Sequence, residues 1–330
     1  MRKRIHKILV TGGAGFIGSE FVRQLSREYP RKKGGLIVVD KLTYAGDLVR
    51  LAEARGKYKF YKSDICDKAR MNAIFKKERP QVVVNFAAET HVDRSIADAS
   101  VFIETNVKGA HTLLEVSKKY NIDKFFQIST DEVYGDIKRG RFNENSPLKP
   151  NSPYAASKAA ADLLIRSYVR TYGFPAVIIR PCNNYGPWQY PEKLIPVIIS
   201  NAMQDKKIPV YSKGLNVREW LYVSDCARAI LLLMDKGKAG EIYNIGSGYY
   251  AKNINVVKII LKIKGKPHKL IQFVDDRLGH DFRYSLDYSK LRKLGWKPKI
   301  DLFSGLQDTV VWNLTNSKWL MSKNKIKTDA

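Results

Sequence analysis

Short apolar runs alternate with helical patterns through the first half of the chain. The runs at 8–10, 36–39, 58–61, 82–86 and 125–129 are rich in β-branched or aromatic residues and predict strands. The stretches between them predict helices over about 16–28 and 101–119. Because continuous apolar strands that alternate with helices are typical of a sheet covered on both faces, we expect an α/β fold with a Rossmann-like, doubly wound parallel sheet.

The second half has a different pattern. Gly and Pro interrupt the region 181–220 repeatedly, which indicates loops that shape a pocket. Helical patterns return at 227–234 and 255–262, and 241–245 resembles a late strand of the main sheet. We therefore expect two domains and a tail. The larger domain comprises 1–180 plus about 221–247, the smaller, discontinuous α/β domain comprises about 181–220 plus 248–317, and 318–330 forms a flexible basic tail.

Composition limits the classes of function. The 330 residues carry a formal net charge of +26, which by itself would allow nucleic-acid binding. The Lys and Arg clusters are scattered, however, and lack the interleaved aromatic residues of a base-stacking surface. A basic surface on an enzyme with anionic ligands explains the charge better, so nucleic acid is not expected as the main partner.

Three features bear on location. No apolar run is long enough to span a bilayer, so no membrane association is expected. Cys66, Cys182 and Cys226 are far apart and odd in number, which is typical of a reduced cytoplasmic protein and offers no metal-ligand spacing. The basic N-terminus leads into a short strand and does not resemble a signal peptide.

A glycine-rich turn, TGGAGFIG at 11–18, separates the first predicted strand from the first predicted helix. Glycines allow a tight turn and close approach of a dinucleotide diphosphate to the helix N-terminus. Asp40 ends the next strand, where a carboxylate accepts hydrogen bonds from both ribose hydroxyls and repels a 2′-phosphate. The pattern predicts NAD rather than NADP, although the neighbouring Lys41 weakens the preference. A purely structural turn is the alternative.

Tyr154 and Lys158 are four residues apart, so both lie on one face of a helix that Ser152 and Pro153 are expected to start. A nearby ammonium and a cationic nicotinamide favour the phenolate, which could then take a proton from a sugar hydroxyl. The alternative is a solvated lysine and a packing tyrosine.

Thr130, Asp131 and Glu132 follow the strand at 125–129. They therefore lie at the carboxyl end of the sheet, where open α/β folds bind ligands. Neighbours on a regular strand point in opposite directions, so the two carboxylates can meet one substrate only if the strand has ended. The alternative is a pair of solvated loop carboxylates.

At this point the chain resembles the extended short-chain dehydrogenase/reductases. Within them it is similar to the nucleoside-diphosphate-glucose 4,6-dehydratases, above all those that act on dTDP-glucose. The resemblance covers nearly the whole chain. It is carried by segments 39–46, 85–95, 130–135, 183–187, 191–196, 218–221 and 276–281.

The resemblance implies a lyase cycle in which NAD is reduced and regenerated. Tyr154, hydrogen-bonded to Thr130 and assisted by Lys158, would deprotonate the C4 hydroxyl during oxidation of the sugar. Glu132 would remove the C5 proton, and protonated Asp131 would donate to the departing C6 hydroxyl. The product would be a 4-keto-6-deoxy sugar nucleotide, and deoxysugar biosynthesis is the expected context.

The same resemblance implies the binding residues. Cofactor contacts are expected from Gly12, Gly15, Phe16, Ile17, Gly18, Asp40, Lys41, Thr43, Asp64, Ile65, Ala87, Ala88, Thr105, Tyr154, Lys158 and Asn184. Substrate contacts are expected from Thr90, Thr130, Asn183, Glu192, Lys193, Leu194, Pro209, Tyr211, Arg218, Asn253, Arg277, His280 and Tyr284. Departures from the family pattern, several of them near the expected nucleotide site, leave the base open between thymine, uracil and cytosine. They are Cys182, Ser212, Cys226, Tyr249, Tyr250 and Phe282.

Two enzyme alternatives share the fold, a UDP-sugar 4-epimerase and a UDP-glucuronate decarboxylase. Neither needs adjacent Asp and Glu after the threonine, so Asp131 and Glu132 discriminate against both. A third alternative is a non-catalytic NAD-binding protein whose basic surface binds nucleic acid. Apolar faces at 101–119 and 155–172 also predict a homodimer through a four-helix bundle, which the resemblance supports.

Overall fold

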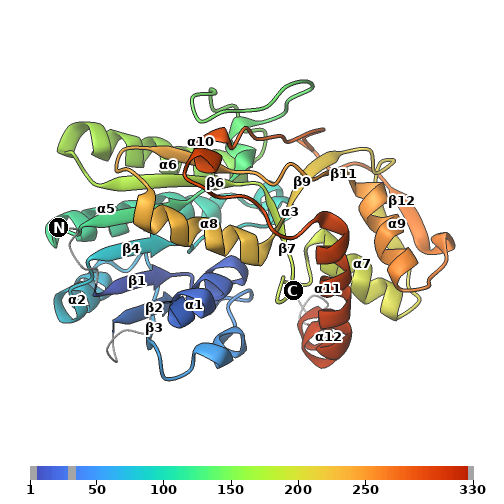
Figure 1. The fold of residues 1–330 in the computed structure, drawn as a ribbon, viewed down its shortest axis with the longest axis horizontal. Coiled ribbons are helices and arrows are strands. Elements are labelled where there is room, and N and C mark those ends of the chain that lie inside the picture. Colours follow the sequence, from blue (N-terminus) through green and yellow to red (C-terminus); the bar gives the residue numbers. More distant parts are fainter. Residues whose placement is uncertain (1–5, 29–34, 326–330) are drawn as a thin grey trace.

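A large parallel sheet with helices on both faces lies beside a smaller lobe in the computed structural model, which describes residues 6–28 and 35–325 (Figure 1). The strand order is β10-β6-β5-β4-β1-β2-β3, and the Rossmann-like fold is thereby confirmed. Strand β6 was not assigned from the sequence. The strands are β1 Ile8–Thr11, β2 Leu36–Asp40, β3 Lys59–Lys62, β4 Val82–Asn85, β5 Lys124–Ile128, β6 Ala176–Pro181 and β10 Ile242–Ile245.

Helices cover the two faces of this sheet in separate sets. Helices α1 (Phe16–Glu28) and α8 (Val223–Lys236) pack on one face. Helices α2 (Lys68–Glu78), α5 (Ala110–Lys119) and α6 (Pro153–Tyr172) pack on the other. Strands β1, β2 and β4 are buried along their whole length, which explains why their sequences are continuously apolar instead of alternating.

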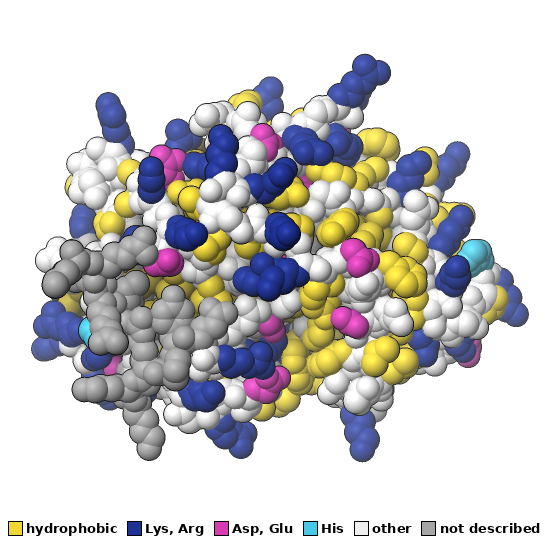
Figure 2. Space-filling model, in the orientation of Figure 1, with side chains coloured by type: hydrophobic (Ala, Val, Ile, Leu, Met, Phe, Trp, Pro, Cys, Tyr) yellow, Lys and Arg dark blue, Asp and Glu magenta, His cyan; other side chains and the backbone are white. Residues whose placement is uncertain are grey.

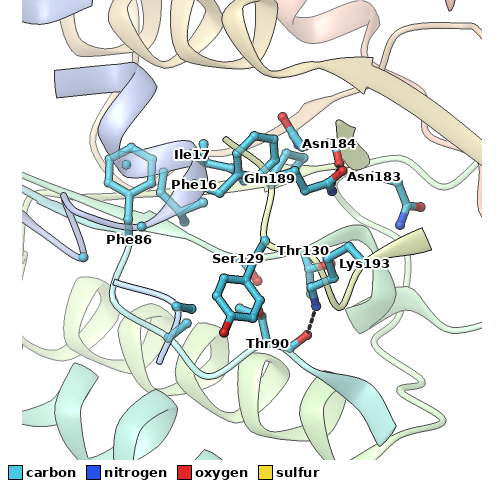
Figure 3. A pocket seen from close by; sticks show the side chains of 18 of the residues that line it. Phe16, Ile17, Phe86, Thr90, Ser129, Thr130, Asn183, Asn184, Gln189 and Lys193 are labelled. Atoms are coloured by element: carbon cyan, nitrogen blue, oxygen red, sulfur yellow. Dashed lines mark hydrogen bonds between the residues drawn. The ribbon is translucent and has the colours of Figure 1, made fainter. Parts of the chain in front are cut away.

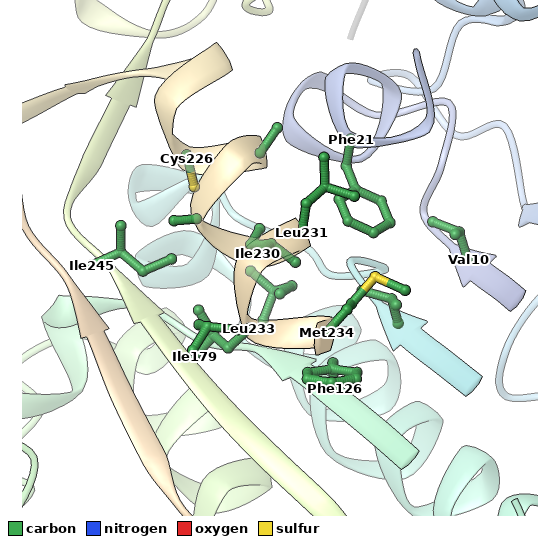
Figure 4. Packing of buried hydrophobic residues seen from close by; sticks show 14 of the residues in the cluster. Val10, Phe21, Phe126, Ile179, Cys226, Ile230, Leu231, Leu233, Met234 and Ile245 are labelled. Carbon is green, nitrogen blue, oxygen red and sulfur yellow. The ribbon is translucent and has the colours of Figure 1, made fainter. Parts of the chain in front are cut away.

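The core beneath α1 and α8 shows how the late segment returns to the main sheet (Figure 4). Ile230 and Leu233 of α8 lie with Phe21 of α1 and Phe126 of β5, and all four are 0% exposed. Burial of each such side chain contributes about 1.5–3 kcal/mol. The chain therefore re-enters the sheet through α8 and β10 after building part of the smaller lobe.

The helix predicted at 101–119 is present but irregular. It begins as α4 (Ser100–Phe102), widens into a π-helical segment, η2 (Ile103–Gly109), and ends as α5. A π-helical turn inserts extra backbone and changes the direction of side chains, and such turns are frequent at functional sites.

The smaller lobe has its own core of helices over two small sheets. One sheet has the order β11-β9-β7, and the other pairs β12 with β8. The segment 181–220, where the sequence predicts loops that shape a pocket, also contains a helix, α7, and three strands that the sequence did not reveal. The elements are β7 Asn183–Tyr185, α7 Leu194–Met203, β8 Ile208–Tyr211, β9 Val217–Tyr222, β11 Tyr250–Lys252, α9 Asn253–Ile263, β12 Ile271–Val274 and α11 Leu302–Thr315.

The first part of the expected flexible tail is helical. Helix α12 spans Ser317–Lys325, and Leu320 within it is 0% exposed. Trp319 packs edge-on against Trp188 and donates its indole N–H to Asp47 at 3.0 Å. These contacts explain why a basic segment is ordered. Residues 326–330 lie outside the described part of the chain.

The surface of the described fold shows how its charge is distributed. In Figure 2, Lys and Arg side chains are spread over the visible face and do not gather in one patch. Within 6–28 and 35–325, no helix combines the length and the apolarity that crossing a membrane requires. The short elements are η1 Leu48–Ala54, α3 Val92–Ala97, η3 Asp131–Tyr134, η4 His268–Leu270 and α10 Ser289–Lys293.

Candidate active site

The glycine-rich turn between β1 and α1 leaves no room for side chains. Gly12 has φ of +65°, and a Cβ there would lie 2.5 Å from the backbone nitrogen of Ala87. A Cβ on Gly18 would lie 2.3 Å from the carbonyl oxygen of Gly12. Glycine is therefore required sterically, and the turn brings backbone amides to the open end of α1 as a bound diphosphate needs.

Two adjoining cavities run along the carboxyl edge of the sheet, and both are lined by Gly12 and Gly15 of the glycine-rich turn. Figure 3 shows side chains that line the first of them. Each residue predicted to contact the cofactor lines one of these cavities or both. Thr43, Asp64, Ile65, Ala87 and Thr105 line the cavity beyond Asp40. Asn184 lines the other with Tyr154 and Lys158. The structure thus brings the predicted set together, although their contacts with a cofactor remain predictions.

Asp40 is fixed at the end of β2. Its carboxylate accepts hydrogen bonds from the backbone N–H of Ala14 at 2.9 Å and of Leu42 at 2.8 Å. Burial raises the pKa of Asp40, and these two hydrogen bonds oppose the rise. Lys41 forms an ion pair with Asp64 at 2.7 Å. The lysine charge is therefore balanced within the cavity wall, which removes part of the objection to NAD over NADP.

The π-helical segment positions another wall of the site. Thr105 lines the cavity, and the side chain of Asn106, next along the segment, is buried. Asn106 accepts a hydrogen bond from the N–H of Glu89 at 2.9 Å and donates to the Glu89 carbonyl at 3.0 Å and to Ser157 at 2.8 Å. The irregular helix therefore holds the loop after β4 against α6.

The carboxylate motif follows directly on the end of β5. Thr130 caps a short 3-10 turn by accepting the N–H of Glu132 at 3.3 Å, and the turn begins at Asp131. Because the strand has ended at Ile128, neighbouring side chains need not point to opposite faces. Thr130, Asp131 and Glu132 all line the same cavity.

Tyr154 and Lys158 project from the first turns of α6 into that cavity. The helix begins as predicted, with Ser152 accepting the N–H of Ala155 at 3.1 Å and Pro153 in its first turn. Lys158 donates to the carbonyl of Ile128 at 2.6 Å. The ammonium is therefore held beside the end of β5.

Burial dominates the electrostatics of these groups. It raises the pKa of Asp131 well above its usual value, with the charge of Glu132 as the next cause. Burial also raises the pKa of Glu132, against the opposing charge of Arg277. Asp131 is therefore suited to carry a proton at neutral pH, as a general acid requires.

The expected lowering of the Tyr154 pKa is not found in the protein alone. Burial raises the pKa of Tyr154, the charge of Glu132 adds to the rise, and a hydrogen bond with Thr130 opposes it. Burial also lowers the pKa of Lys158 to about 8. A cation beside the phenol is thus needed to favour the phenolate, and a bound oxidised nicotinamide would supply one.

Several predicted substrate residues line the cavity: Asn183, Glu192 and Lys193 come from the segment after β6, and Thr90 comes from the loop after β4. Lys193 donates to the Thr90 carbonyl at 2.8 Å, the contact drawn in Figure 3. Glu192 accepts from the Tyr44 hydroxyl at 3.0 Å. These two contacts join segments on opposite sides of the site.

The other predicted substrate residues do not line the two cavities. Among them, Arg277 forms an ion pair with Asp93 at 3.5 Å, and Arg218 packs 4.4 Å from the ring centre of Tyr284. The charges of Arg277, Arg218 and Lys193 all act on Glu132, so these three side chains lie around that carboxyl group. Those outside the cavity lining are Leu194, Pro209, Tyr211, Arg218, Asn253, Arg277, His280 and Tyr284.

The cavity also contains residues that were not selected from the sequence. They are Ala45, Arg50, Phe86, Ile128, Ser129, Pro181, Cys182, Gln189 and Tyr190. Ser129, Gln189 and Tyr190 adjoin recognised motifs, so proximity to those motifs was a usable signal. Arg50 lies in a segment without a recognised motif, so the sequence offered no signal for it.

Fold and site together define a dinucleotide-dependent enzyme of the extended short-chain dehydrogenase/reductase type. A profile described as GDP-mannose 4,6 dehydratase matches residues 9–309. The chain belongs to this family.

Similar proteins occur in several bacteria. A dTDP-glucose 4,6-dehydratase from Actinoplanes sp. is 46% identical over 95% of this chain and 99% of its own length. One from Salmonella typhimurium is 44% identical over 98% of this chain and 96% of its own length. The predicted resemblance to dTDP-glucose 4,6-dehydratases is confirmed.

Solved structures of similar proteins have the same fold as this chain. The dTDP-glucose 4,6-dehydratase DesIV from Streptomyces venezuelae, with NAD and TYD bound, superposes with a TM-score of 0.91 at 47% identity, over 95% of this chain and 98% of its own. A UDP-glucose 4-epimerase from Thermotoga maritima with UDP-glucose has a TM-score of 0.88 at 33% identity, over 94% and 99%. The epimerase shares the fold, so residues of the site must decide between the reactions.

Proposed function

We propose that this protein is an NAD-dependent dTDP-glucose 4,6-dehydratase, which converts dTDP-glucose to dTDP-4-keto-6-deoxyglucose and water. One observation carries the proposal. Asp131 and Glu132 line the same cavity as Thr130, Tyr154 and Lys158. Oxidation alone uses only the last three groups, whereas elimination of water needs an additional acid and an additional base.

The described residues fit NAD. The turn has no room for a Cβ at Gly12 or Gly18, and Asp40 lines the adjoining cavity at the end of β2, where this fold binds ribose hydroxyls. Buried polar atoms of Asn184 and Gln189 in the cavity lining have no hydrogen-bond partner among the described residues, as expected of atoms that face a polar ligand. When bound, NAD supplies reversible oxidation of the sugar and leaves the cycle unchanged.

Tyr154 acts as the base for the C4 hydroxyl, with Thr130 hydrogen-bonded beside it. Lys158 keeps its charge close to the phenol through the contact with Ile128. Loss of the hydroxyl proton makes oxidation at C4 possible, and the resulting ketone acidifies the proton on C5.

Glu132 then takes the C5 proton while Asp131 gives its own proton to the departing C6 hydroxyl. Departure of hydroxide is unfavourable, so protonation at that moment accelerates the step. The surroundings suit these roles: positive side chains oppose the rise in the pKa of Glu132, whereas the negative charge of Glu132 adds to the rise at Asp131. One carboxyl is thus available as a base and the other as an acid.

The smaller lobe is proposed to bind the nucleotide sugar. Arg218 and Arg277 provide positive charge next to the catalytic carboxylates, and a guanidinium binds phosphate oxygens in a bidentate manner. Glu192 and Lys193 are proposed to bind the sugar from the cavity wall, with Asn183 and Thr90.

Two further properties are proposed with this activity. Val101, Ile103, Leu163 and Tyr172 are 45–58% exposed on η2, α4 and α6, which supports a homodimer in which these helices from both protomers form a four-helix bundle. A cytoplasmic location is supported by three free cysteines, none of them paired within the described residues.

Incubation of the purified protein with dTDP-glucose tests the function. The proposal expects a product lighter by one water and no net consumption of NAD. Parallel incubations with UDP-glucose and CDP-glucose test the base. Formation of dTDP-galactose without loss of water would instead identify an epimerase.

A further inference from the structure

Arg50 is one of the largest fully buried side chains of the protein, although a guanidinium is charged at any physiological pH. It lies on the 3-10 helix η1 and is only 1% exposed. Burial lowers the pKa of Arg50 to about 10, and the charges of Asp47 and Asp40 oppose this change. A buried cation is costly unless opposite charges and hydrogen bonds compensate it, so the partners of each guanidinium nitrogen matter.

Part of the compensation comes from backbone carbonyls. Arg50 donates to the carbonyl oxygens of Ala14 at 3.0 Å and of Trp188 at 3.2 Å, and also to that of Ala45. These carbonyls belong to the glycine-rich turn, the loop after β2 and the loop after β7. One side chain therefore joins three segments that surround the cofactor cavity.

The remaining nitrogen has no such partner. Nη2 of Arg50 is buried without a hydrogen bond among the described residues, and Arg50 is part of the lining of the cavity that holds Gly12, Gly15 and Ile17. Trp319 of α12 packs against the guanidinium, and Cζ of Arg50 lies 5.3 Å from the centre of the indole ring. The cation is thus fixed beside the glycine turn by its contact with Ala14, and it lines the same cavity as Gly12 and Gly15.

We propose that Arg50 is an electrostatic anchor for the diphosphate of bound NAD, adding a buried positive charge to the backbone amides at the N-terminus of α1. In a buried setting such a charge acts strongly, because solvent does not screen it. By holding Ala14 and Ala45, Arg50 also keeps the cradle in shape. It is a positioning residue, since it acts from beside the turn. The inference rests on the NAD cofactor of the proposed function.

The test separates the charge from the shape of the cradle. Arg50→Gln removes the charge and keeps an amide that can still donate to a carbonyl. We expect the variant to release NAD, measured by exchange against labelled NAD, about tenfold faster than the unmodified protein. ADP, which carries a diphosphate, should compete for the site about tenfold less well, while adenosine should compete within about twofold of its original strength.

Arg23→Gln is the matched control. Arg23 is also buried, at 4% exposure, and donates to the carbonyl of Arg50, but it does not line either cavity. It should leave the ratio of ADP to adenosine unchanged. If Arg50→Gln weakens the binding of ADP and of adenosine equally, Arg50 has only a structural role and the proposal is overturned. A folded variant that binds both as strongly as the unmodified protein does would also overturn it. An unmodified protein that retains no NAD would instead refute the cofactor assignment.

Discussion

The hydroxyl of Thr130 lies 3.2 Å from Oδ1 of Asp131, while Oδ2 of Asp131 is buried without a hydrogen-bond partner among the described residues. A carboxylate in such a place has little to stabilise its charge, because burial and the neighbouring Glu132 both raise the pKa of Asp131. The carboxylic acid form is therefore favoured, and one oxygen remains available to a ligand.

This arrangement predicts the effect of Asp131→Asn on catalysis. The amide keeps the size of the side chain but cannot transfer a proton to the C6 hydroxyl. We expect turnover to fall about 100-fold or more. Because oxidation at C4 does not use this group, the nicotinamide should still become reduced when substrate is added, which absorbance measures. Unchanged turnover would exclude Asp131 as the acid.

The same substitution should change stability in a pH-dependent manner. The folded-state pKa of Asp131 is raised above the unfolded value near 3.8, so its contribution to stability is fully present below that pH and is lost as pH rises through the folded pKa. Because asparagine does not ionise, Asp131→Asn removes this loss of stability at higher pH. Thermal unfolding should show the variant gaining stability over the unmodified protein as pH increases. A difference that shrinks with increasing pH would contradict the sign of the shift.

Glu132→Gln should separate oxidation from elimination. The variant lacks the base for the C5 proton, so exchange of that proton with deuterated solvent should fall about 100-fold or more, while reduction of the nicotinamide persists. Nuclear magnetic resonance of the sugar measures the exchange. Glu53→Gln, at a 58% exposed side chain outside the cavity, is the control and should leave exchange unchanged. Exchange at the original rate in Glu132→Gln would show that another group is the base.

Tyr154→Phe should act one step earlier. Without the phenol oxygen, no group is placed to take the C4 hydroxyl proton, so reduction of the nicotinamide on mixing should slow about 100-fold or more. Stopped-flow absorbance measures this step directly. Rapid reduction followed by slow elimination would instead assign Tyr154 to the later chemistry.

Helix α12 provides a test of stability. Trp319→Phe keeps an aromatic ring and removes the indole hydrogen bond to Asp47, which should cost about 1 kcal/mol of unfolding free energy. Lys323→Met, which breaks the ion pair with the same carboxylate, should cost less than about 1 kcal/mol. Urea unfolding measures both. A chain that ends at residue 316 and remains equally stable would show that the segment is a dispensable tail after all.

Some elements were predictable because one local signal decides them. The runs at 36–39 and 82–86 are continuously apolar, and both are strands buried on their two faces. Ser152 and Pro153 mark the start of α6, and Asp40 ends β2 where the motif requires it. The carboxylate motif at 130–132 was recognisable for the same reason, because its residues are adjacent in sequence and line one cavity.

Other elements depend on tertiary contacts that local patterns do not reveal. Helix α7 was missed because Pro196 suggested a loop, although proline is tolerated in a first helical turn. Helix α12 was missed because its composition is basic and its order comes from the distant Asp47 and Trp188. Arg50 gave no signal, since only the fold encloses it beside the glycine turn. The burial that raises the pKa of Tyr154 also gave no local signal, because it comes from the packing of distant segments.

Tracing the hydrogen from C4 of the substrate tests the central claim most directly. If Tyr154, Glu132 and Asp131 act around one hexose, dTDP-glucose that carries deuterium at C4 should yield the 4-keto-6-deoxy product with that deuterium at C6. Solvent hydrogen should appear at C5. Recovery of the deuterium at C4 of an epimerised sugar, or a product without deuterium at C6, would contradict the account.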